Sequence, residues 1–327
     1  MRIRAIITLA LLGICLQGQA DERPEAQLTF KIVDDTGKPL PGIEVGMATF
    51  IRWIPGSEFG KDIHDGPKGK TDEKGLITVA YPSKTGNFGY SIHQTPGYYR
   101  DQGDEYTFKT AEDGEWQPWN PTLELVFKPI LNPVPMYARR VWAVPLPEIN
   151  QPVGFDLIES DWVAPHGKGK TADFIFKIER QYESVEKPFD ATLTVTFSND
   201  GDGIQPVYAK PHKGSLLRLP RQAPEDGYES KLIRKLYRDA GQPIVSDKRD
   251  DQNYFFRVRT EKTNGKIVSA MYGKIHGDIE FDIINSPTAL LVFTYYLNPT
   301  PNDRNMEFDP QKNLFKKLKS TESVQDP

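Results

Sequence analysis

The chain has 327 residues and a formal net charge of −4, from 41 basic and 45 acidic side chains. This balance argues against the concentrated basic surface that nucleic-acid binding requires, so we predict no nucleic-acid partner. The 27 prolines and 26 glycines recur along the whole sequence and exclude long helices. The short apolar runs between them alternate in period two and favour Val, Ile, Phe, Tyr and Thr. We therefore predict an all-β protein, and its length favours two domains.

Residues 1–20 have the pattern of a secretory signal peptide. The apolar run from Ala5 to Leu16 follows two arginines and is too short to cross a bilayer. Gly18-Gln19-Ala20 supplies the small residues that signal peptidase reads, so we expect cleavage before Asp21. A membrane anchor is the alternative, but no second apolar segment follows. We therefore expect an exported protein, periplasmic or extracellular, with no transmembrane anchor after cleavage.

The only cysteine, Cys15, lies inside this segment. Ile14 stands where a lipoprotein signal would have a small residue, so lipidation is not expected. The mature chain then has neither a disulfide nor a thiolate zinc site. The histidines show no helical i, i+4 spacing and no His-x-His pair, so we predict no metal site and no cofactor. The sequence leaves open whether they converge in the fold. The histidines are His64, His93, His166, His212 and His276.

Two turns organise the front of the chain, residues 27–128. The first, Asp34 to Gly42, separates the apolar runs Leu28 to Val33 and Ile43 to Met47. The second, Lys70 to Gly75, precedes another apolar run. Glycines allow tight reversals on either side of the rigid Pro-Leu-Pro, and Thr and Asp side chains can bond the turn amides.

This order of elements resembles the carboxypeptidase regulatory-like domain. The resemblance rests on a strand, Asp-x-x-Gly-Lys-Pro-Leu-Pro-Gly, a second strand, and Thr-Asp-x-x-Gly before a third. Gly89 to His93, Pro96-Gly97-Tyr98 and Leu123 to Phe127 resemble the later strand, turn and closing strand of the family. The resemblance implies a transthyretin-like β-sandwich over residues 27–128. It also implies a folding, spacing or binding accessory without catalytic residues.

Two long loops depart from the family pattern and carry aromatic side chains. They run from Met47 to Lys70 and from Tyr98 to Pro121. Aromatic rings in loops can stack on sugar rings or anchor a partner protein. Alternatively, they pack the loops onto the sandwich or onto the second domain. The candidate ligand-binding residues are Trp53, Tyr99, Trp116 and Trp119.

A proline-rich linker, residues 129–135, follows the sandwich, because its three prolines hold the backbone extended. Residues 136–315 are expected to form a larger, mainly antiparallel β domain of no recognised family. Residues 316–327 are expected to be a disordered tail. Asn264-Gly265 is the strongest hairpin signal. The predicted strands of this domain are Ala138 to Val144, Gly154 to Ile158, Ala172 to Ile178, Ala191 to Ser198, Tyr254 to Thr260, Ile267 to Ile275, Ile279 to Ile284 and Ala289 to Tyr296.

One short helix is predicted in this domain. Asp226 can cap it, Glu229 completes a capping box, and Gly241 is placed to end it. Its other face is basic, which indicates a solvated face or, alternatively, a patch for an acidic partner. The apolar stripe of the helix is Leu232, Ile233, Leu236 and Tyr237.

Three short motifs have residues that could carry chemistry. Ala164 to Thr171 fits a relaxed phosphate-binding loop, but a strand pattern follows it, so a glycine-rich turn and no nucleotide are predicted. Asn199 to Gly203 resembles part of a calcium loop without its first and last carboxylates, so a hairpin turn is favoured. Glu159 and Asp161 beside Trp162 would suit glycoside chemistry, but an exposed strand end is favoured.

No motif in the chain supplies a catalytic signature. We therefore favour an exported non-catalytic β protein that binds a glycan, a protein or another cell-envelope component. The alternative is a secreted hydrolase of polysaccharide or peptide, with its active site in the second domain and the sandwich as an accessory. A buried carboxylate pair or converging histidines in a cleft of the second domain would favour the hydrolase.

Overall fold

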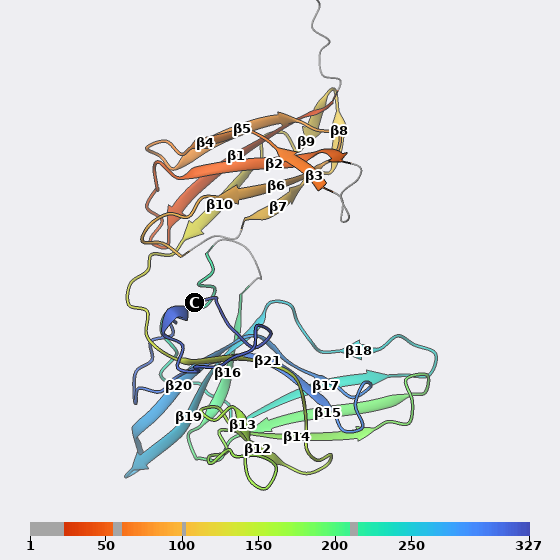
Figure 1. Ribbon diagram of the computed structural model, residues 1–327, viewed down its shortest axis with the longest axis vertical. Helices are drawn as coiled ribbons and strands as arrows, with labels where there is room; N and C mark the ends of the chain where they lie inside the picture. The colour runs from red at the N-terminus through yellow and green to blue at the C-terminus, as the bar shows by residue number, and fades with distance from the viewer. Residues whose placement is uncertain (1–22, 55–60, 100–102, 210–214) are drawn as a thin grey trace, which may run out of the picture.

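The computed structural model describes residues 23–54, 61–99, 103–209 and 215–327. Within these ranges the chain is built of strands, with a single 3-10 turn at Pro310–Lys312 and no α-helix, which confirms the all-β class. The predicted signal peptide, residues 1–20, lies outside the described ranges. In the described part, no helix has the length and apolar character needed to span a membrane. Figure 1 shows two β units, one above the other, which we call the front and back units.

The front unit is a sandwich of two sheets. One has the order β10-β1-β9-β8 with β5 also on β1, and the other has the order β3-β2-β6-β7 with β4 also on β2. Leu28, Phe30 and Ile32 of the first strand are fully buried, because alternate residues of a strand point to the same face. The strands are β1 (Glu25–Asp34), β2 (Glu44–Ile54), β3 (Lys61–Asp65), β4 (Lys68–Lys70), β5 (Leu76–Pro82), β6 (Asn87–Ile92), β7 (Asp104–Thr107), β8 (Thr110–Glu112), β9 (Glu115–Gln117) and β10 (Thr122–Phe127).

The two turns that mark this unit in the sequence are joined in space. Asp34 and Asp72 each accept two backbone amides of their own turn. The hydroxyl of Thr71 donates to the carbonyl of Leu40 at 2.6 Å and accepts from the amide of Ile43 at 2.9 Å. The second turn therefore closes the first, which explains why both motifs occur together.

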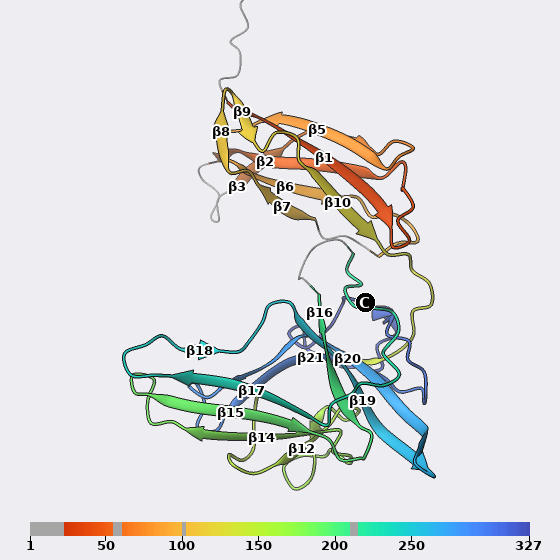
Figure 2. The ribbon, with the colours of Figure 1, turned by 180° about the vertical axis from the view of Figure 1, so that it is seen from behind.

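The back unit is a second, larger pair of sheets (Figure 2). Sheet I has the order β11-β21-β20-β19-β16, and sheet II has the order β13-β12-β14-β15-β17-β18. A core rich in phenylalanine lies between them, including Phe155, Phe174, Phe176, Phe256 and Phe293. The strands are β11 (Tyr137–Pro145), β12 (Val153–Asp156), β13 (Asp161–Trp162), β14 (Phe174–Gln181), β15 (Phe189–Thr196), β16 (Gly203–Tyr208), β17 (Lys231–Arg238), β18 (Val245–Ser246), β19 (Gln252–Thr263), β20 (Lys266–Asp282) and β21 (Leu290–Asn298).

The predicted hairpin of this unit is confirmed. Thr263 pairs with Lys266 at the end of β19 and β20. Asn264 and Gly265 between them have φ angles of 52° and 76°, as a two-residue turn of this kind requires.

The predicted helix is wrong, because residues 231–238 form β17. This strand pairs along its whole length with β15, from Phe189↔Arg238 to Thr196↔Lys231. Leu232 and Leu236 face the core, and the buried Arg234 lies between them, where alternation would place an apolar residue. Because Arg234 interrupts the apolar positions of the inner face, the sequence does not alternate between apolar and polar residues as a strand normally does. The remaining apolar positions have the spacing of a helical stripe.

The C-terminal segment is ordered against sheet I, contrary to the expectation of a disordered tail at 316–327. Glu322 pairs with Arg139 at 2.9 Å, and the side chain of Val324 is buried. With residues around Leu219 and Met306, this segment covers the face of sheet I that is turned away from sheet II, which we call the outer face. Both views place the C-terminal end between the two units (Figures 1 and 2).

The junction between the units centres on Glu307, which is 1% exposed. One carboxylate oxygen accepts the Tyr99 hydroxyl at 2.7 Å and the Leu131 amide at 2.8 Å, and the other accepts the Asn132 amide at 3.0 Å. Arg221 lies 3.8 Å from this carboxylate and also pairs with Asp35 in the first turn of the front unit. The linker is therefore bonded to both units.

Substitution of Gly75 tests the turn pair. Gly75 has φ +72°, and a Cβ there would lie 2.3 Å from the carbonyl oxygen of Ile32. Gly37 has φ +85° but open space around it, so it is the matched control. We expect Gly37→Ala to cost about 1–2 kcal/mol of unfolding free energy from backbone strain alone. Gly75→Ala should cost roughly 1–3 kcal/mol more because of the clash. Equal costs in urea unfolding would contradict the packing of the turns.

Substitution of Tyr99 tests the junction. Tyr99→Phe removes a hydroxyl that donates to the buried carboxylate of Glu307, so we expect a loss of about 1.5–3 kcal/mol. The control is Tyr98→Phe, which keeps the ring contact with Phe127. Calorimetric melting of the full chain is the measurement. A Tyr99→Phe protein that melts like the Tyr98→Phe protein would show that this hydrogen bond does not hold the units together.

Candidate functional site

The aromatic residues predicted to bind ligand do not form one site in the described part of the chain. Tyr99 is buried at the junction, with its hydroxyl on Glu307. The indole N–H of Trp116 donates to the carbonyl of Ser83 at 3.0 Å, and its ring packs against the core of the front unit. Trp119 is 37% exposed. The side chain of Trp53 lies outside the described residues.

The glycine-rich segment Ala164–Thr171 is a turn whose amides already have anionic partners. The amides of Lys170 and Thr171 donate to the carboxylate of Asp156 at 2.9 and 3.0 Å, and the amide of Lys168 donates to Asp161 at 3.1 Å. A phosphate-binding loop needs free amides that point at the ligand. The structure therefore agrees with a turn and not with a nucleotide site.

The motif Asn199–Gly203 is also internally satisfied. Asp202 is buried and accepts the amides of Thr260 at 2.8 Å and Arg259 at 3.2 Å, while Asp200 pairs with Lys262 at 2.7 Å. The turn joins β15 of sheet II to β16 of sheet I, so the expectation of a hairpin is wrong. Within the described ranges, no group of three or more His, Cys, Asp and Glu side chains could hold a metal ion.

Trp162 offers no aromatic platform to the carboxylates of Glu159 and Asp161. Trp162 is 6% exposed and packs edge-on against Phe155 in the core. Glu159 pairs with Lys170 at 2.6 Å, and Asp161 accepts backbone amides. These side chains stabilise the loop that connects β12 to β14.

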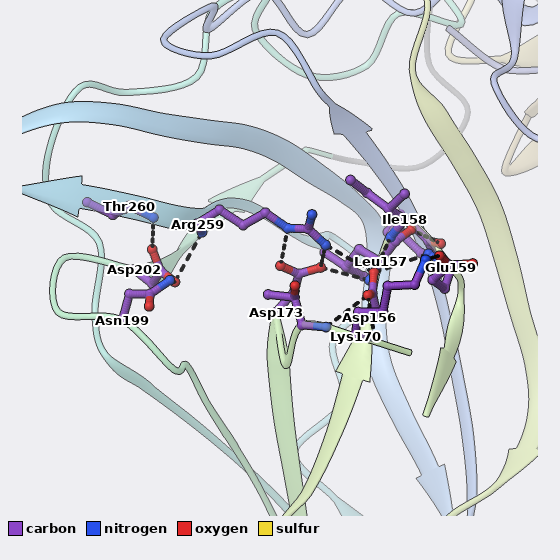
Figure 3. A network of polar contacts seen from close by, with 12 residues as sticks. Asp156, Leu157, Ile158, Glu159, Lys170, Asp173, Asn199, Asp202, Arg259 and Thr260 are labelled. Carbon is purple, nitrogen blue, oxygen red and sulfur yellow. Dashed lines mark hydrogen bonds and ion pairs between the residues drawn. The ribbon is translucent and has the colours of Figure 1, made fainter. Parts of the chain in front are cut away.

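A buried ionic network ties the two sheets of the back unit together (Figure 3). Arg259 on β19 of sheet I donates to both carboxylate oxygens of Asp173, at 2.8 and 2.9 Å, and to Asp156 at 3.0 Å. Asp173 and Asp156 flank strands of sheet II. Burial would raise the pKa of Asp156, but four backbone amides outweigh it and hold the pKa below its usual value. The network is structural, since every carboxylate in it is bonded to protein groups.

A cleft of about 410 Å³ lies on the outer face of sheet I. Arg140 of β11, Thr294 of β21 and His276 of β20 form a row across its floor, because Thr294 pairs with both of the others. The C-terminal segment Ser323–Asp326 forms part of the wall. The residues that line the cleft are Arg140, Arg218, His276, Gly277, Asp278, Glu280, Val292, Phe293, Thr294, Tyr296, Ser323, Val324, Gln325 and Asp326.

Below this floor lies a buried polar pair, Lys274 and Tyr296. The Lys274 ammonium donates to the carbonyl of Met306 at 2.7 Å and lies 4.7 Å from the centre of the Tyr296 ring. Complete burial lowers the pKa of Lys274 to about 7. Burial also raises the pKa of Tyr296 well above its usual value, so the Tyr296 hydroxyl stays protonated at neutral pH.

The hydroxyl of Tyr296 contacts the ring of His276. Burial is the main cause that lowers the pKa of His276 well below its usual value, and the positive charges of Lys274 and Arg218 lower this pKa further. The imidazole is therefore neutral. The Tyr296 oxygen lies 3.0 Å from Nδ1 of His276. We assign the Tyr296 hydroxyl as the donor and Nδ1 as the acceptor, which leaves the hydrogen of the neutral ring on Nε2. Nε2 is buried and has no hydrogen-bond partner among the described residues.

An exposed tryptophan lies beside Arg140, which lines the cleft. Trp142 is two residues beyond Arg140 on β11 and is 51% exposed. The Arg140 guanidinium lies 3.9 Å from the centre of the Trp142 ring. Arg140 and Trp142 also line a second cleft of about 210 Å³, so the two clefts meet at Arg140.

Strand alternation is the one local signal in the sequence that indicates part of this site. Alternation within the predicted strand at β11 places Arg140 and Trp142 on one face. His276, however, falls between the predicted strands Ile267 to Ile275 and Ile279 to Ile284, which the structure joins into the single strand β20. The register that brings Arg140 and His276 together depends on pairing with β21 and could not be read from the sequence.

Asp156 provides a test of the ionic network by pH. Because the native pKa is below the ordinary value of 3.8, the carboxylate stabilises the fold above that value, and this contribution is lost as pH falls through the native pKa. We expect Asp156→Asn to cost about 2–3 kcal/mol at pH 7, with the difference from wild type shrinking below about pH 4. Urea unfolding of both proteins at four pH values measures this difference in stability. Asp200→Asn, which alters an exposed ion pair, should change stability far less. A pH-independent difference for Asp156→Asn would contradict the assignment.

Comparisons with known proteins give distant structural likeness only. No protein-family model matches the chain, and no curated protein matches it. A streptococcal ancillary pilin is similar at 12% identity and a TM-score of 0.23, over 82% of this chain and 58% of that one. The major pilin BcpA of Bacillus cereus is similar at 11% identity and a TM-score of 0.25, over 82% of this chain and 69% of the pilin. The shaft pilin SpaA of Lactobacillus rhamnosus GG is similar at 15% identity and a TM-score of 0.21, over 56% of this chain and 90% of the pilin. The chain thus spans less than two thirds of the ancillary pilin, and at these TM-scores the likeness supports no statement about function.

Proposed function

We propose that the protein is an exported, non-catalytic β protein that binds a saccharide of the cell envelope or its surroundings in the cleft on sheet I. The front unit, which resembles the carboxypeptidase regulatory-like domain in sequence, is proposed as an accessory sandwich. The observation that carries the proposal is the meeting of an exposed tryptophan, Trp142, with a polar cleft floor at Arg140.

The chemistry of the cleft suits a polyol. A sugar presents apolar C–H faces to an aromatic ring and hydroxyl oxygens to hydrogen-bonding side chains. Trp142 supplies a half-exposed ring, while Arg140, Thr294 and His276 supply polar groups along one line. The cleft is open and lies on strands, which hold these groups in place better than loops would.

The hydrolase alternative receives less support from the same cleft. A glycosidase needs two carboxylates free to act as acid and base or nucleophile. Asp278 is bonded to Arg234 and to the Tyr254 hydroxyl, and Glu280 pairs with Lys248 at 3.0 Å. Among the described residues that line the cleft, a single histidine is present, so the convergence of histidines that would favour catalysis is not seen there.

Replacement of the exposed tryptophan tests the proposal. Trp142→Ala should weaken saccharide binding about ten-fold or more, about 1.4 kcal/mol, because the stacking surface is lost. Trp119→Ala is the matched control, since Trp119 is the exposed candidate in the front unit. A glycan array followed by titration of the best ligand into the full mature chain is the measurement.

The outcomes separate the sites. Loss of binding in Trp119→Ala with Trp142→Ala unaffected would place the site in the loops of the front unit. Absence of binding to any saccharide would overturn the proposed function. Both side chains lie at the surface, so neither variant is expected to alter folding, and calorimetric melting checks this.

A further inference from the structure

We propose that the saccharide carries an oxyanion, a carboxylate or a sulfate ester, which binds between Arg140 and His276 on the floor of the cleft. This inference rests on the proposed function and adds the chemical class of the ligand. Stacking on Trp142 requires only a sugar ring, whereas this inference requires a negatively charged group on the sugar that contacts Arg140 and His276.

The register of sheet I sets the positions of these groups. Arg140 and His276 each pair with Thr294, so one strand separates them. Neighbouring strands lie about 4.8 Å apart, which puts the two backbones about 10 Å from each other. Arg140 comes from one side of the floor and His276 from the other, with the small side chain of Thr294 between them. A compact group of the ligand fits above Thr294.

The charges in the cleft leave Arg140 as the cation without a carboxylate. Three acidic side chains line the cleft, and each has its own cation: Asp278 has Arg234, Glu280 has Lys248, and Asp326 has Arg218. Among the described residues, Arg140 has no carboxylate within ion-pair distance, and its guanidinium lies over Trp142 instead. A guanidinium presents a planar fork of donors that matches the oxygens of an oxyanion.

His276 contributes a second donor that lacks an acceptor. Its Nε2–H is buried without a partner among the described residues, and an unsatisfied buried donor costs about 1–3 kcal/mol. A ligand oxygen at this point would remove that cost, whereas a ligand N–H would not. Because the imidazole is neutral, the donor needs no counter-ion, and the charge of the ligand is balanced by Arg140 alone.

Matched polymers give the test. The full mature chain is titrated with polygalacturonate and with the same polymer after reduction of its carboxyl groups, and separately with dextran sulfate and with dextran. We expect the acidic member of one pair to bind at least ten-fold more tightly than its neutral partner, with affinity falling as salt rises. The pair that shows the preference identifies the oxyanion as carboxylate or sulfate.

Variants tie the preference to the site. Arg140→Gln should abolish the acidic preference. The control is Arg249→Gln, because Arg249 also lies over an exposed aromatic ring, that of Tyr208, but pairs with Asp251. Arg249→Gln should keep the preference. The net charge of −4 makes non-specific attraction of polyanions a weak competitor.

Three results would overturn the inference. Equal binding of acidic and neutral polymers, with sensitivity to Trp142→Ala, would leave the proposed function standing and refute the oxyanion site. A preference that survives Arg140→Gln would place the anion elsewhere. Absence of binding to all four polymers and to the glycan array would refute both the inference and the proposed function.

Discussion

The relation between the two units depends on one buried carboxylate, that of Glu307. A buried charge is tolerated only when hydrogen bonds and an opposite charge replace the water it has lost. Glu307 receives a hydroxyl from the front unit, two amides from the linker and the nearby charge of Arg221. These groups come from three different parts of the chain. The carboxylate is therefore satisfied only when front unit, linker and back unit are in place together.

This constraint shapes the proposed site. The linker leads directly into β11, which carries Arg140 and Trp142, so the position of the front unit also fixes where the site-bearing edge of sheet I begins. The segment that contains Glu307 continues over the outer face of sheet I and ends in the wall of the cleft. The junction and the cleft are thus two parts of one covering layer. The cleft lies where this layer does not cover Arg140, Thr294 and His276.

Polar groups inside the back unit have different roles, and their partners tell the roles apart. Arg259, Asp173 and Asp156 satisfy one another and join sheet I to sheet II. Arg234 and Asp278 form an ion pair that joins β17 of sheet II to β20 of sheet I. Arg140 and His276, in contrast, both line the cleft and have unused binding capacity among the described residues: Arg140 has no carboxylate partner, and the buried Nε2 of His276 has no hydrogen-bond partner. A fully satisfied group is explained by stability, whereas an unsatisfied one at a cleft indicates a ligand.

The sequence by itself determined the local structure of this protein. Proline and glycine density, period-two alternation and Asn264-Gly265 predicted an all-β chain, the strands β11, β19 and β21 of sheet I, and the hairpin between β19 and β20, because these signals act between near neighbours. They missed β16 and divided β20 into two strands, Ile267 to Ile275 and Ile279 to Ile284. They failed at β17, where Arg234 faces inward, and at the C-terminal segment, where partners such as Arg139 lie far away in sequence. Only the tertiary structure decided the junction and the cleft. The pairing of β11, β21 and β20 aligns Arg140 with His276. The register of β11 on β21 joins Arg140 to Thr294, which is far away in the sequence, and no local pattern encodes it.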